Sequence, residues 1–507
     1  MPSEHDPVLP PNAMARVRSA VRNAVRLSRK IARWTLKRLR KAARWTLKGL
    51  RKATKWSRKT ARGLFKGLRK TARRVRAQLR FAVDHVAWLL MHCPLPLPWF
   101  PSMRRRDQLT QLFRLAAQED VRDRSLLSGI DFLLFSALWP IVSGVQTLSY
   151  VWRFGQSARS GFGVSIGRQI LRCWRLAAVH GIAPEQFYKF RPFIKGRVDL
   201  APYYIQHEQI VALHRHLNAG TNTSILDSKI LFHRFCRNHG LPCVPIFAIF
   251  QEDGQIFWLD VDPDFVPRVD LFFKPDDWWR GIGSELWHRD PENSTWSRGE
   301  QTLDQATLLQ HFAKLASGTR DHLLQPRIRN NEQIQTFSPR ALATIRVVTY
   351  RFPGQEPRPL AARLAIPMGT KDTDHDAMGC GVDLLSGALS PAVLEFFDPE
   401  NLQTLGSRHA LDEWDHHPIT NAPIAGERLE GWDEMLAICS RAHLALGMPA
   451  FIGWDVTMSD QGPVLVEGNA AWGHTTAQVP QNKPLGNTPF VECYFANLET
   501  KGRTSTD

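Results

Sequence analysis

The chain has 507 residues, enough for two or three domains and at least one large core. Its 43% hydrophobic and 22% charged residues are typical of a globular protein. Seven cysteines without a CxxC pair argue against a disulfide framework or a zinc site and indicate a reducing compartment. The net charge of +18 is unusual, and its distribution along the chain is uneven.

The positive charge belongs to an N-terminal arm. Arg16 to Arg80 contain 26 Lys and Arg, and no Asp or Glu occurs between Asp6 and Asp84, which leaves 40 basic against 48 acidic residues in the rest. The start of the chain lacks the pattern of a secretory signal, so we do not expect one. An organellar transit peptide remains an alternative for such an Arg-rich leader.

Residues 30–62 repeat with a period of 11, as KIARWTLKRLR, KAARWTLKGLR and KATKWSRKTAR. Eleven residues complete about three helical turns, so each copy presents nearly the same face. Trp34, Trp45 and Trp56 edge an apolar arc opposite the basic side chains. This pattern predicts a basic amphipathic helix at an anionic membrane surface. A solvated helix packed on the body or on a second copy is the alternative, and we do not expect nucleic acid as a partner.

An uncharged run, FLLFSALWPIVSGVQTLSYVW, extends from Phe132 to Trp152 after the stiff connector PLPLPWFP. Its length suits a bilayer, but Pro140, Ser143 and Gln146 weaken that interpretation. We therefore expect a buried or half-inserted helix near the membrane, with a spanning helix as the less favoured alternative.

From about residue 183 the pattern changes to alternating strands and helices, as in an α+β protein. Expected strands are Pro242 to Phe250, Gln255 to Leu259, Val269 to Pro275, Ala343 to Phe352 and Pro359 to Ile366. Expected helices are Ser228 to Gly240, Thr302 to Ser317 and Gly431 to Leu446. The predicted regions are thus an arm (1–92), a helical linker (93–182), the main domain (183–495) and a disordered tail (496–507).

A hairpin near the end of the main domain carries candidate metal ligands. Residues 451–458 and 463–466 alternate as strands do, and Ser459 to Gly462 has the composition of a turn. Pairing these strands brings Asp455 close to Glu467 and Asn469. Oxygen donors without nearby sulfur suit a hard cation such as Mg²⁺. A surface hairpin with ordinary polar residues is the alternative.

These segments resemble the ATP-grasp superfamily. The residues that carry the resemblance, in chain order, are Lys229, Lys274, Gln325, Arg346, Asp455, Glu467 and Asn469. More narrowly, FFKP, LLQPRI, LATIRVVTYR and GPVLVEGN resemble the sugar-transfer-associated ATP-grasp family, which is related to the α-L-glutamate ligases. The resemblance implies an α+β ATP-grasp fold, in which two α+β subdomains grip ATP, preceded by the basic amphipathic helical region.

The resemblance also implies roles for individual residues. ATP would be bound by Lys229, Lys274, Arg280, Gly281, Gly283 and Gln325. Magnesium, expected as two ions, would be held by Asp455, Glu467 and Asn469. Arg346 and Lys274 would act in catalysis, and Arg363 and Asp374 would contact the substrate. Each residue also has a simpler interpretation: Lys274 as a surface lysine, Lys229 as a partner of Asp227, and Arg346 as a partner of a buried acid.

The implied function is an ATP- and Mg²⁺-dependent carboxylate–amine ligase that acts through an acyl phosphate, in synthesis or modification of a surface polysaccharide. Its substrates would be small or sugar-linked carboxylates and amines, and the protein would be cytoplasmic, peripheral at the inner face of the membrane. Two departures favour an alternative, a catalytically weak nucleotide-binding scaffold at the membrane. Pro326 follows Gln325 and has no amide hydrogen for adenine, and Trp278 and Trp279 replace small residues in the expected phosphate-covering loop.

Overall fold

The computed structural model describes residues 106–122, 126–259, 261, 266–276, 283–368, 377–395, 397, 406 and 409–504. The chain divides into two compact units, Met1–His92 and Cys93–Asp507. The amphipathic arm lies outside the described residues, as do Arg280, Gly281 and Asp374. All the described residues belong to the second unit.

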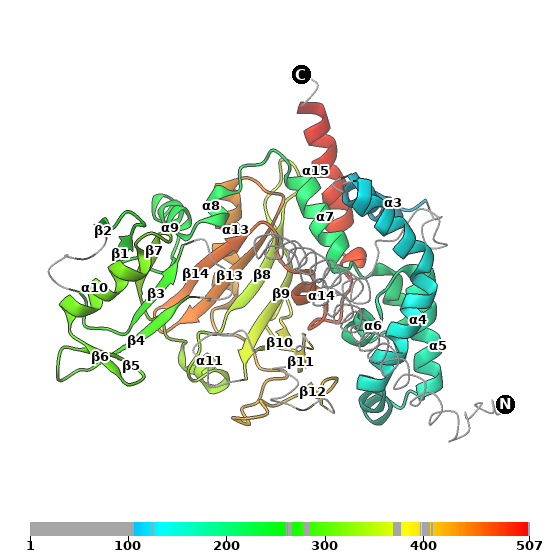
Figure 1. The fold of residues 1–507 in the computed structure, drawn as a ribbon, viewed down its shortest axis with the longest axis horizontal. Coiled ribbons are helices and arrows are strands. Elements are labelled where there is room, and N and C mark those ends of the chain that lie inside the picture. Colours follow the sequence, from blue (N-terminus) through cyan, green and yellow to red (C-terminus); the bar gives the residue numbers. More distant parts are fainter. Residues whose placement is uncertain are drawn as a thin grey trace, which may run out of the picture. The chain divides into compact units, whose positions relative to one another are not determined.

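The described residues form two seven-stranded sheets in which neighbouring strands are antiparallel (Figure 1). The small sheet has the order β2 (Ile256–Trp258), β1 (Ala248–Phe250), β7 (His322–Pro326), β3 (Leu271–Pro275), β4 (Glu285–Arg289), β5 (Trp296–Arg298) and β6 (Gln301–Leu303). The large sheet has the order β12 (Glu413–Trp414), β11 (Ala392–Leu394), β10 (Ala377–Gly381), β9 (Arg358–Pro367), β8 (Ile345–Tyr350), β13 (Phe451–Ser459) and β14 (Gly462–Asn469).

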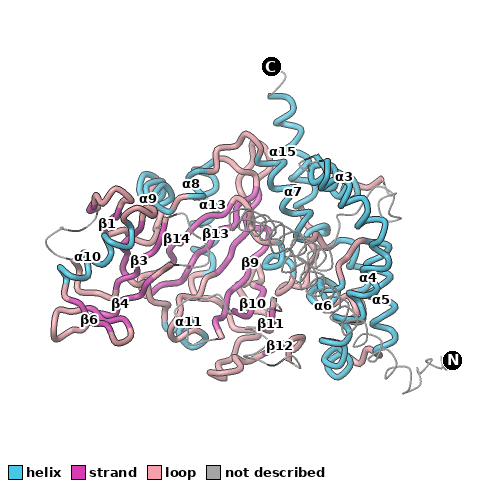
Figure 2. Tube along the Cα trace, in the orientation of Figure 1, coloured by secondary structure: helices cyan, strands magenta, loops and turns pink. Residues whose placement is uncertain are grey.

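Helices cover both sheets. They are α3 (Gln108–Arg122), α4 (Leu126–Phe162), α5 (Ile166–His180), α6 (Pro184–Phe190), η2 (Val198–Tyr203), α7 (His207–Asn218), α8 (Ser224–Asp227), α9 (Lys229–Asn238), α10 (Gln305–Ala316), α11 (Glu332–Phe337), α13 (Trp432–Leu446), α14 (His474–Gln478), η3 (Leu485–Asn487) and α15 (Phe490–Thr504). Figure 2 shows that they flank the strands and gather at the end where α3 to α6 lie. The mixed α+β class predicted from the sequence is confirmed.

Each sheet has a helix-covered face built from alternate strand residues. In the small sheet, Phe273 stacks on Phe312 of α10, with ring centroids 4.2 Å apart. In the large sheet, Trp454 faces the core that contains α13, whereas Val348 faces the core formed by α7, α14 and α15. Arg346, two positions before Val348, and its paired residue Asp455 lie on this second face.

Most predicted elements are present with shorter ends, but one strand is much shorter than expected. The sequence predicts a strand from Pro242, whereas β1 begins at Ala248. Pro242 and Pro245 have no amide hydrogen to donate to a neighbouring strand, which explains the late start. Cys243 instead makes an isolated bridge to Leu465 of β14, so this segment ties the small sheet to the hairpin.

The region 93–182 was predicted to be a helical, membrane-proximal linker, and most of its described residues are helical. Its described helices belong to the same compact unit, because α3 contributes Leu112 and Ala116 to the core that also contains Leu213 and Tyr494. The apolar run lies within the 37-residue helix α4. Among the described residues, no helix combines the length and apolar character needed to cross a membrane.

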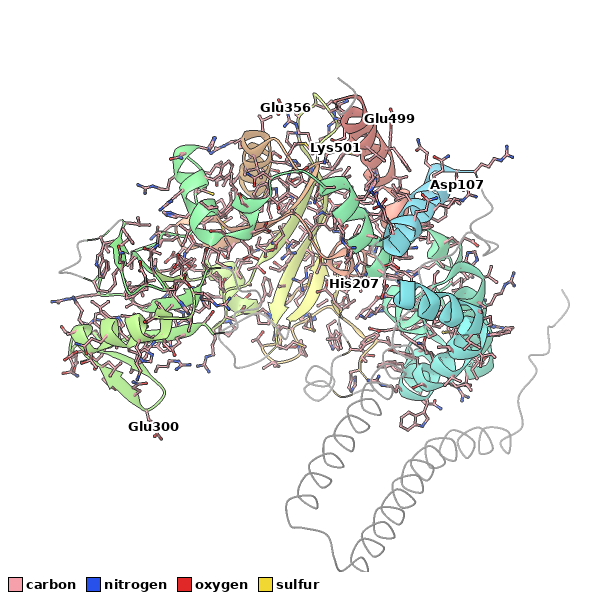
Figure 3. All side chains as sticks on the ribbon, turned by 45° about the horizontal axis from the view of Figure 1, so that its top comes forward. Asp107, His207, Glu300, Glu356, Glu499 and Lys501 are labelled. Atoms are coloured by element: carbon pink, nitrogen blue, oxygen red, sulfur yellow. The ribbon has the colours of Figure 1, made fainter. Side chains whose placement is uncertain are left out.

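The prediction of a disordered tail is wrong for residues 496–504, which continue α15. Asn497 donates to the carbonyl oxygen of Arg351 at 2.9 Å. Lys501, labelled in Figure 3, donates to the carbonyl oxygen of Leu217 at the end of α7, at 2.6 Å. These tertiary contacts hold a polar helix that sequence composition alone does not predict.

Candidate functional site

Helix α9 places Lys229 at its first position. Ser228 caps the helix, because its hydroxyl accepts a hydrogen bond from the Leu231 amide. Asp276, just after β3, accepts from the Ser228 hydroxyl at 2.8 Å and from the Ile230 amide at 2.9 Å. The Lys229 ammonium donates to the Asp276 backbone carbonyl at 2.7 Å. The expected alternative partner of Lys229, Asp227, accepts instead from Thr223.

Lys274 lies on β3 of the small sheet. The small sheet with α9 and α10 is called the small lobe below. It pairs with Leu323 of β7 and shares a face of the sheet with Gln325, which pairs with Phe272. Burial lowers the pKa of Lys274 most and the positive charge of Lys229 lowers it as well, whereas Glu467 and Asp276 oppose them; the net pKa is about 8. Lys274 is therefore not an ordinary surface lysine, because its ammonium is partly removed from water and lies near the positive charge of Lys229.

The large sheet carries a row of charged side chains on neighbouring strands. Arg363 of β9 pairs with Arg346 of β8, Arg346 with Asp455 of β13, and Asp455 with Glu467 of β14. Directly paired residues project from the same face of a sheet, so the four side chains form one row. Asn469 lies two positions beyond Glu467, and its amide donates to the Glu467 carboxylate at 3.3 Å.

Arg346 and Asp455 make a two-point ion pair, although they are 109 positions apart in the chain. The Arg346 Nε donates to one carboxylate oxygen and Nη2 donates to the other at 2.7 Å. Arg346 therefore satisfies a buried acid, as its simpler interpretation proposes, and it does so at the centre of the charged row.

The two neighbouring carboxylates have different protonation preferences. Burial alone would raise the pKa of Glu467, but Lys229, Arg346 and Lys274 outweigh it and hold the pKa below its ordinary value. Burial raises the pKa of Asp455, and the nearby Glu467 charge adds to this, against the pull of Arg346. Charges from α9 and from both sheets thus meet around Glu467, where Lys229, Lys274 and Arg346 surround two neighbouring carboxylates.

Glu467 and Asn469 can supply a carboxylate and an amide oxygen to a magnesium ion. Asp455 can add another oxygen, because a carboxylate that accepts from Arg346 still has lone pairs available. In the described part of the chain, no three His, Cys, Asp or Glu side chains gather into a metal-binding group. The oxygens of Asp455, Glu467 and Asn469 are too few to bind a hard cation alone, so a bound molecule such as a phosphate compound must supply further oxygens.

Arg363 is paired with an acid that the sequence analysis missed. Its guanidinium donates to the carboxylate of Glu395, which is fully buried after β11. The other oxygen of Glu395 has no hydrogen bond among the described groups. The signal in the sequence is a lone glutamate in the apolar run PAVLEFF. Gly379 leaves room for this carboxylate, because a Cβ there would lie 2.6 Å from the Glu395 Cδ.

Asp276 is a second residue that the sequence analysis missed. It directly follows FFKP and organises the start of α9, so it positions Lys229, and its charge also acts on Lys274. The signal in the sequence is weak, because an aspartate after a strand is common on protein surfaces.

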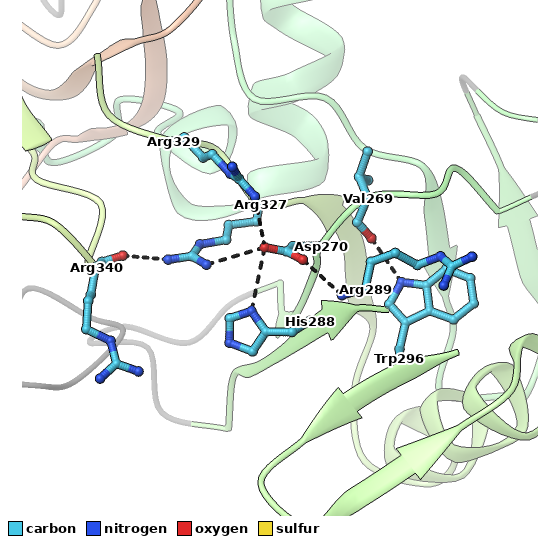
Figure 4. A network of polar contacts seen from close by, with 8 residues as sticks. All are labelled: Val269, Asp270, His288, Arg289, Trp296, Arg327, Arg329 and Arg340. Carbon is cyan, nitrogen blue, oxygen red and sulfur yellow. Dashed lines mark hydrogen bonds and ion pairs between the residues drawn. The ribbon is translucent and has the colours of Figure 1, made fainter. Parts of the chain in front are cut away.

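The chain that leaves β7 is fixed just beyond Gln325 and Pro326. Gln325 is buried, and Pro326 pairs with Leu271 of β3. Figure 4 shows that Asp270 accepts from Arg327 at 3.3 Å, from Arg329 at 3.4 Å and from the Arg289 amide at 2.9 Å. This network stabilises the exit of the strand. Among the other expected ATP contacts, Gly283 is exposed with a φ of 75°, a conformation that favours glycine.

Comparisons with known proteins locate this site in a family. A model of the sugar-transfer associated ATP-grasp family matches residues 208–489, more than half of the chain. No curated protein matches the chain.

Solved structures with some similarity include D-alanyl-alanine synthetase A from Vibrio cholerae O1 biovar eltor, at 12% identity and a TM-score of 0.33, covering 55% of this chain and 65% of that one. They also include the D-alanine–D-alanine ligase of Helicobacter pylori, at 9% identity and a TM-score of 0.29, covering 54% and 58%. VanG D-Ala:D-Ser ligase from Enterococcus faecalis has 11% identity and a TM-score of 0.31, covering 54% and 62%. The match therefore covers less than two thirds of the length of each of these three proteins. The match over residues 208–489 shows that the chain belongs to the sugar-transfer associated ATP-grasp family.

Proposed function

We propose that this protein is an ATP- and Mg²⁺-dependent ligase that joins a carboxylate to an amine and releases ADP. The observation that carries the proposal is the convergence of two lysines from the small sheet on the acids of the large sheet. Glu467 interacts electrostatically with Lys229, Lys274 and Arg346. A triphosphate needs this kind of cationic surround, together with oxygen ligands for its metal ion.

In the proposed reaction, an oxygen of the substrate carboxylate attacks the γ-phosphorus of ATP, and the bond to the β-phosphate oxygen breaks to release ADP. The amine then attacks the carbonyl carbon of the acyl phosphate, phosphate leaves with the electrons of the C–O bond, and the nitrogen loses a proton. Lys229 and Lys274 bind phosphate oxygens, and Arg346 stabilises negative charge on the transferred group. Bound magnesium would neutralise phosphate charge, with Asp455, Glu467 and Asn469 as its protein ligands.

The remaining assignments are part of the same proposal. Arg280, Gly281 and Gly283 would cover the phosphates, and Gln325 would border the adenine site. Arg363 and Asp374 would contact the substrate, which is a small or sugar-linked carboxylate or amine. The family description, sugar-transfer associated, supports a role in synthesis or modification of a surface polysaccharide. The basic amphipathic pattern of the arm supports a place at the cytoplasmic face of a membrane.

The test is to incubate the full chain with ATP, MgCl₂ and pools of amino acids and amino sugars, and to follow ADP and new products by mass spectrometry. A product formed in proportion to ADP supports the ligase. One observation favours the second candidate, a catalytically weak nucleotide-binding scaffold: Pro326 offers no amide hydrogen at the hinge. Saturable ATP binding without ADP formation in any pool would favour that scaffold and contradict the ligase.

The N-terminal arm is proposed to attach the protein to anionic lipid. A peptide of residues 16–80 should have little helicity in low-salt buffer, because its 26 basic side chains repel one another. Anionic vesicles supply opposite charge and an apolar layer, so the peptide should become helical and its tryptophan emission should shift to the blue. If anionic vesicles changed neither the helicity nor the tryptophan emission of the peptide, this attachment would be contradicted.

A further inference from the structure

Helix α4 packs against the core and at the same time exposes a stripe of large apolar side chains. Its outer face exposes four large apolar residues: Leu138 (52%), Ile141 (68%), Val145 (55%) and Trp152 (73%). Their spacing of three, four and seven positions places them on one stripe of the helix. Its inner face buries Trp139 and Phe154 together with the polar residues Ser143, Gln146 and Thr147. In a helix that packs against a core and faces water, the exposed face is normally polar, so the exposed apolar stripe requires an explanation.

The neighbouring helix α5 continues the same exposed surface. Leu171 and Trp174 are 63% and 42% exposed. Trp174 is held against α4, because its indole nitrogen donates to the Pro140 carbonyl at 2.9 Å and its ring lies beside Gly144. Figure 1 shows α4 and α5 side by side. The two helices therefore present one apolar surface, defined here as the α4–α5 face.

Polar contacts inside the helix pair fix this orientation. Gln169 of α5 donates to the Gly155 carbonyl at 3.0 Å and accepts from the Tyr188 hydroxyl at 2.8 Å. Thr147 contacts the Cys173 thiol at 3.5 Å. These side chains would lose their buried partners if α4 rotated to bury its apolar stripe, so the stripe stays on the outside.

The charges beside the α4–α5 face have a single sign. No Asp or Glu occurs from residue 132 to residue 184. The same stretch contains Arg153, Arg159, Arg168, Arg172 and Arg175, all exposed or half-buried. Arg168 and Arg175 lie one turn before and one turn after Leu171, so positive charge flanks the apolar surface directly.

We propose that the α4–α5 face docks on the surface of an anionic lipid bilayer and buries its apolar side chains at the level of the headgroups. Apolar side chains with tryptophan among them, edged by arginine, match the interfacial layer of such a membrane. A second copy of the face would oppose arginine with arginine. The arm of the same chain carries 26 basic residues and no acid between Arg16 and Arg80, so it is repelled as well.

This docking does not depend on the proposed ligase activity. It also places a second contact with lipid on the unit that carries the candidate site, apart from the N-terminal arm. Each contact therefore needs a readout that distinguishes it from the other.

The first experiment uses a local probe on the full chain. Ile141→Cys is labelled with a polarity-sensitive fluorophore, with Leu385→Cys as the matched control, because Leu385 is an exposed apolar residue (93%) of the loop after β10. The unsubstituted chain, labelled in parallel, corrects for the native cysteines. With vesicles of phosphatidylcholine and phosphatidylglycerol, the probe at 141 should shift to the blue and be quenched by brominated lipid, whereas the probe at 385 should not change. Pure phosphatidylcholine should give a weaker response.

The second experiment compares sedimentation with the same vesicles for the parent, for Ile141→Glu combined with Val145→Glu, and for Leu385→Glu. These side chains are exposed, so the substitutions should leave thermal unfolding unchanged. The double variant should lose roughly tenfold or more in vesicle partitioning, and Leu385→Glu should not.

Three results would overturn the proposal. The probe at 141 could keep its aqueous emission while the chain sediments with vesicles, which would assign all binding to the arm. The probe could become buried without lipid as protein concentration rises, which would assign the face to a second copy. The double variant could partition as the parent does.

Discussion

Replacing Lys274 with methionine separates the role of this residue in ATP binding from its effect on stability. Its pKa falls from 10.5 to about 8, chiefly because of burial and then because of Lys229. A pKa unit corresponds to ~1.4 kcal/mol, so the charged lysine costs the folded state up to about 3 kcal/mol at neutral pH. Methionine has a similar length and no charge, so the variant should be more stable than the parent while it loses ATP turnover.

The pH dependence of this stabilisation follows from the depressed pKa. Below about pH 8 the lysine is protonated in both the folded and unfolded chains, and the full cost is present. Between about pH 8 and 10.5 the unfolded chain binds the proton and the folded chain does not, so the cost disappears as pH rises. The advantage of the variant should therefore be largest at neutral pH and vanish in strong base.

The assay is thermal unfolding of the full chain at neutral pH, measured with and without added ATP. We expect the Tm of Lys274→Met to rise by a few degrees and to stop responding to ATP. Lys314→Met, at an exposed position of α10 in the same lobe, is the matched control and should change neither quantity. A lower Tm together with parental ATP kinetics would refute the reasoning.

Three further perturbations test the site. Glu467→Gln keeps the shape of the side chain but removes its charge, so ATP turnover should fall by about 10²-fold or more. The control Glu499→Gln, at an exposed position of α15 (Figure 3), should leave turnover unchanged. Equal turnover in both variants would reject the metal assignment. The parent's kcat/KM for ATP should decline above about pH 8, as Lys274 loses its proton, and a profile that stays flat in that range would count against a phosphate contact. Glu395→Ala removes the carboxylate that pairs with the Arg363 guanidinium. The free energy of unfolding in urea should therefore fall by about 3–5 kcal/mol. A loss below about 1 kcal/mol would show that the ion pair is not structurally important.

Local patterns in the sequence determined the secondary structure around the site. Alternation of apolar residues predicted β8, β9, β13 and β14, and helical spacing predicted α9, α10 and α13. The order of Lys274, Arg346, Asp455 and Glu467 along the chain was enough to indicate the family, because each follows a short recognisable strand pattern. These signals are short-range, and single strands and helices depend mainly on short-range side-chain order.

Contacts between distant segments were decided only by the tertiary structure. The pairing of Arg346 with Asp455 and of Arg363 with Glu395 depends on strand order in the large sheet, which periodicity does not encode. The helical state of residues 496–504 depends on packing against α7 and on bonds to Arg351, which override a polar composition. The direction in which α4 presents its apolar stripe depends on buried polar partners in α5 and α6. The hydrophobicity of a segment indicates how much apolar surface it would bury favourably. Only the packing in the folded protein determines which side of the segment remains exposed.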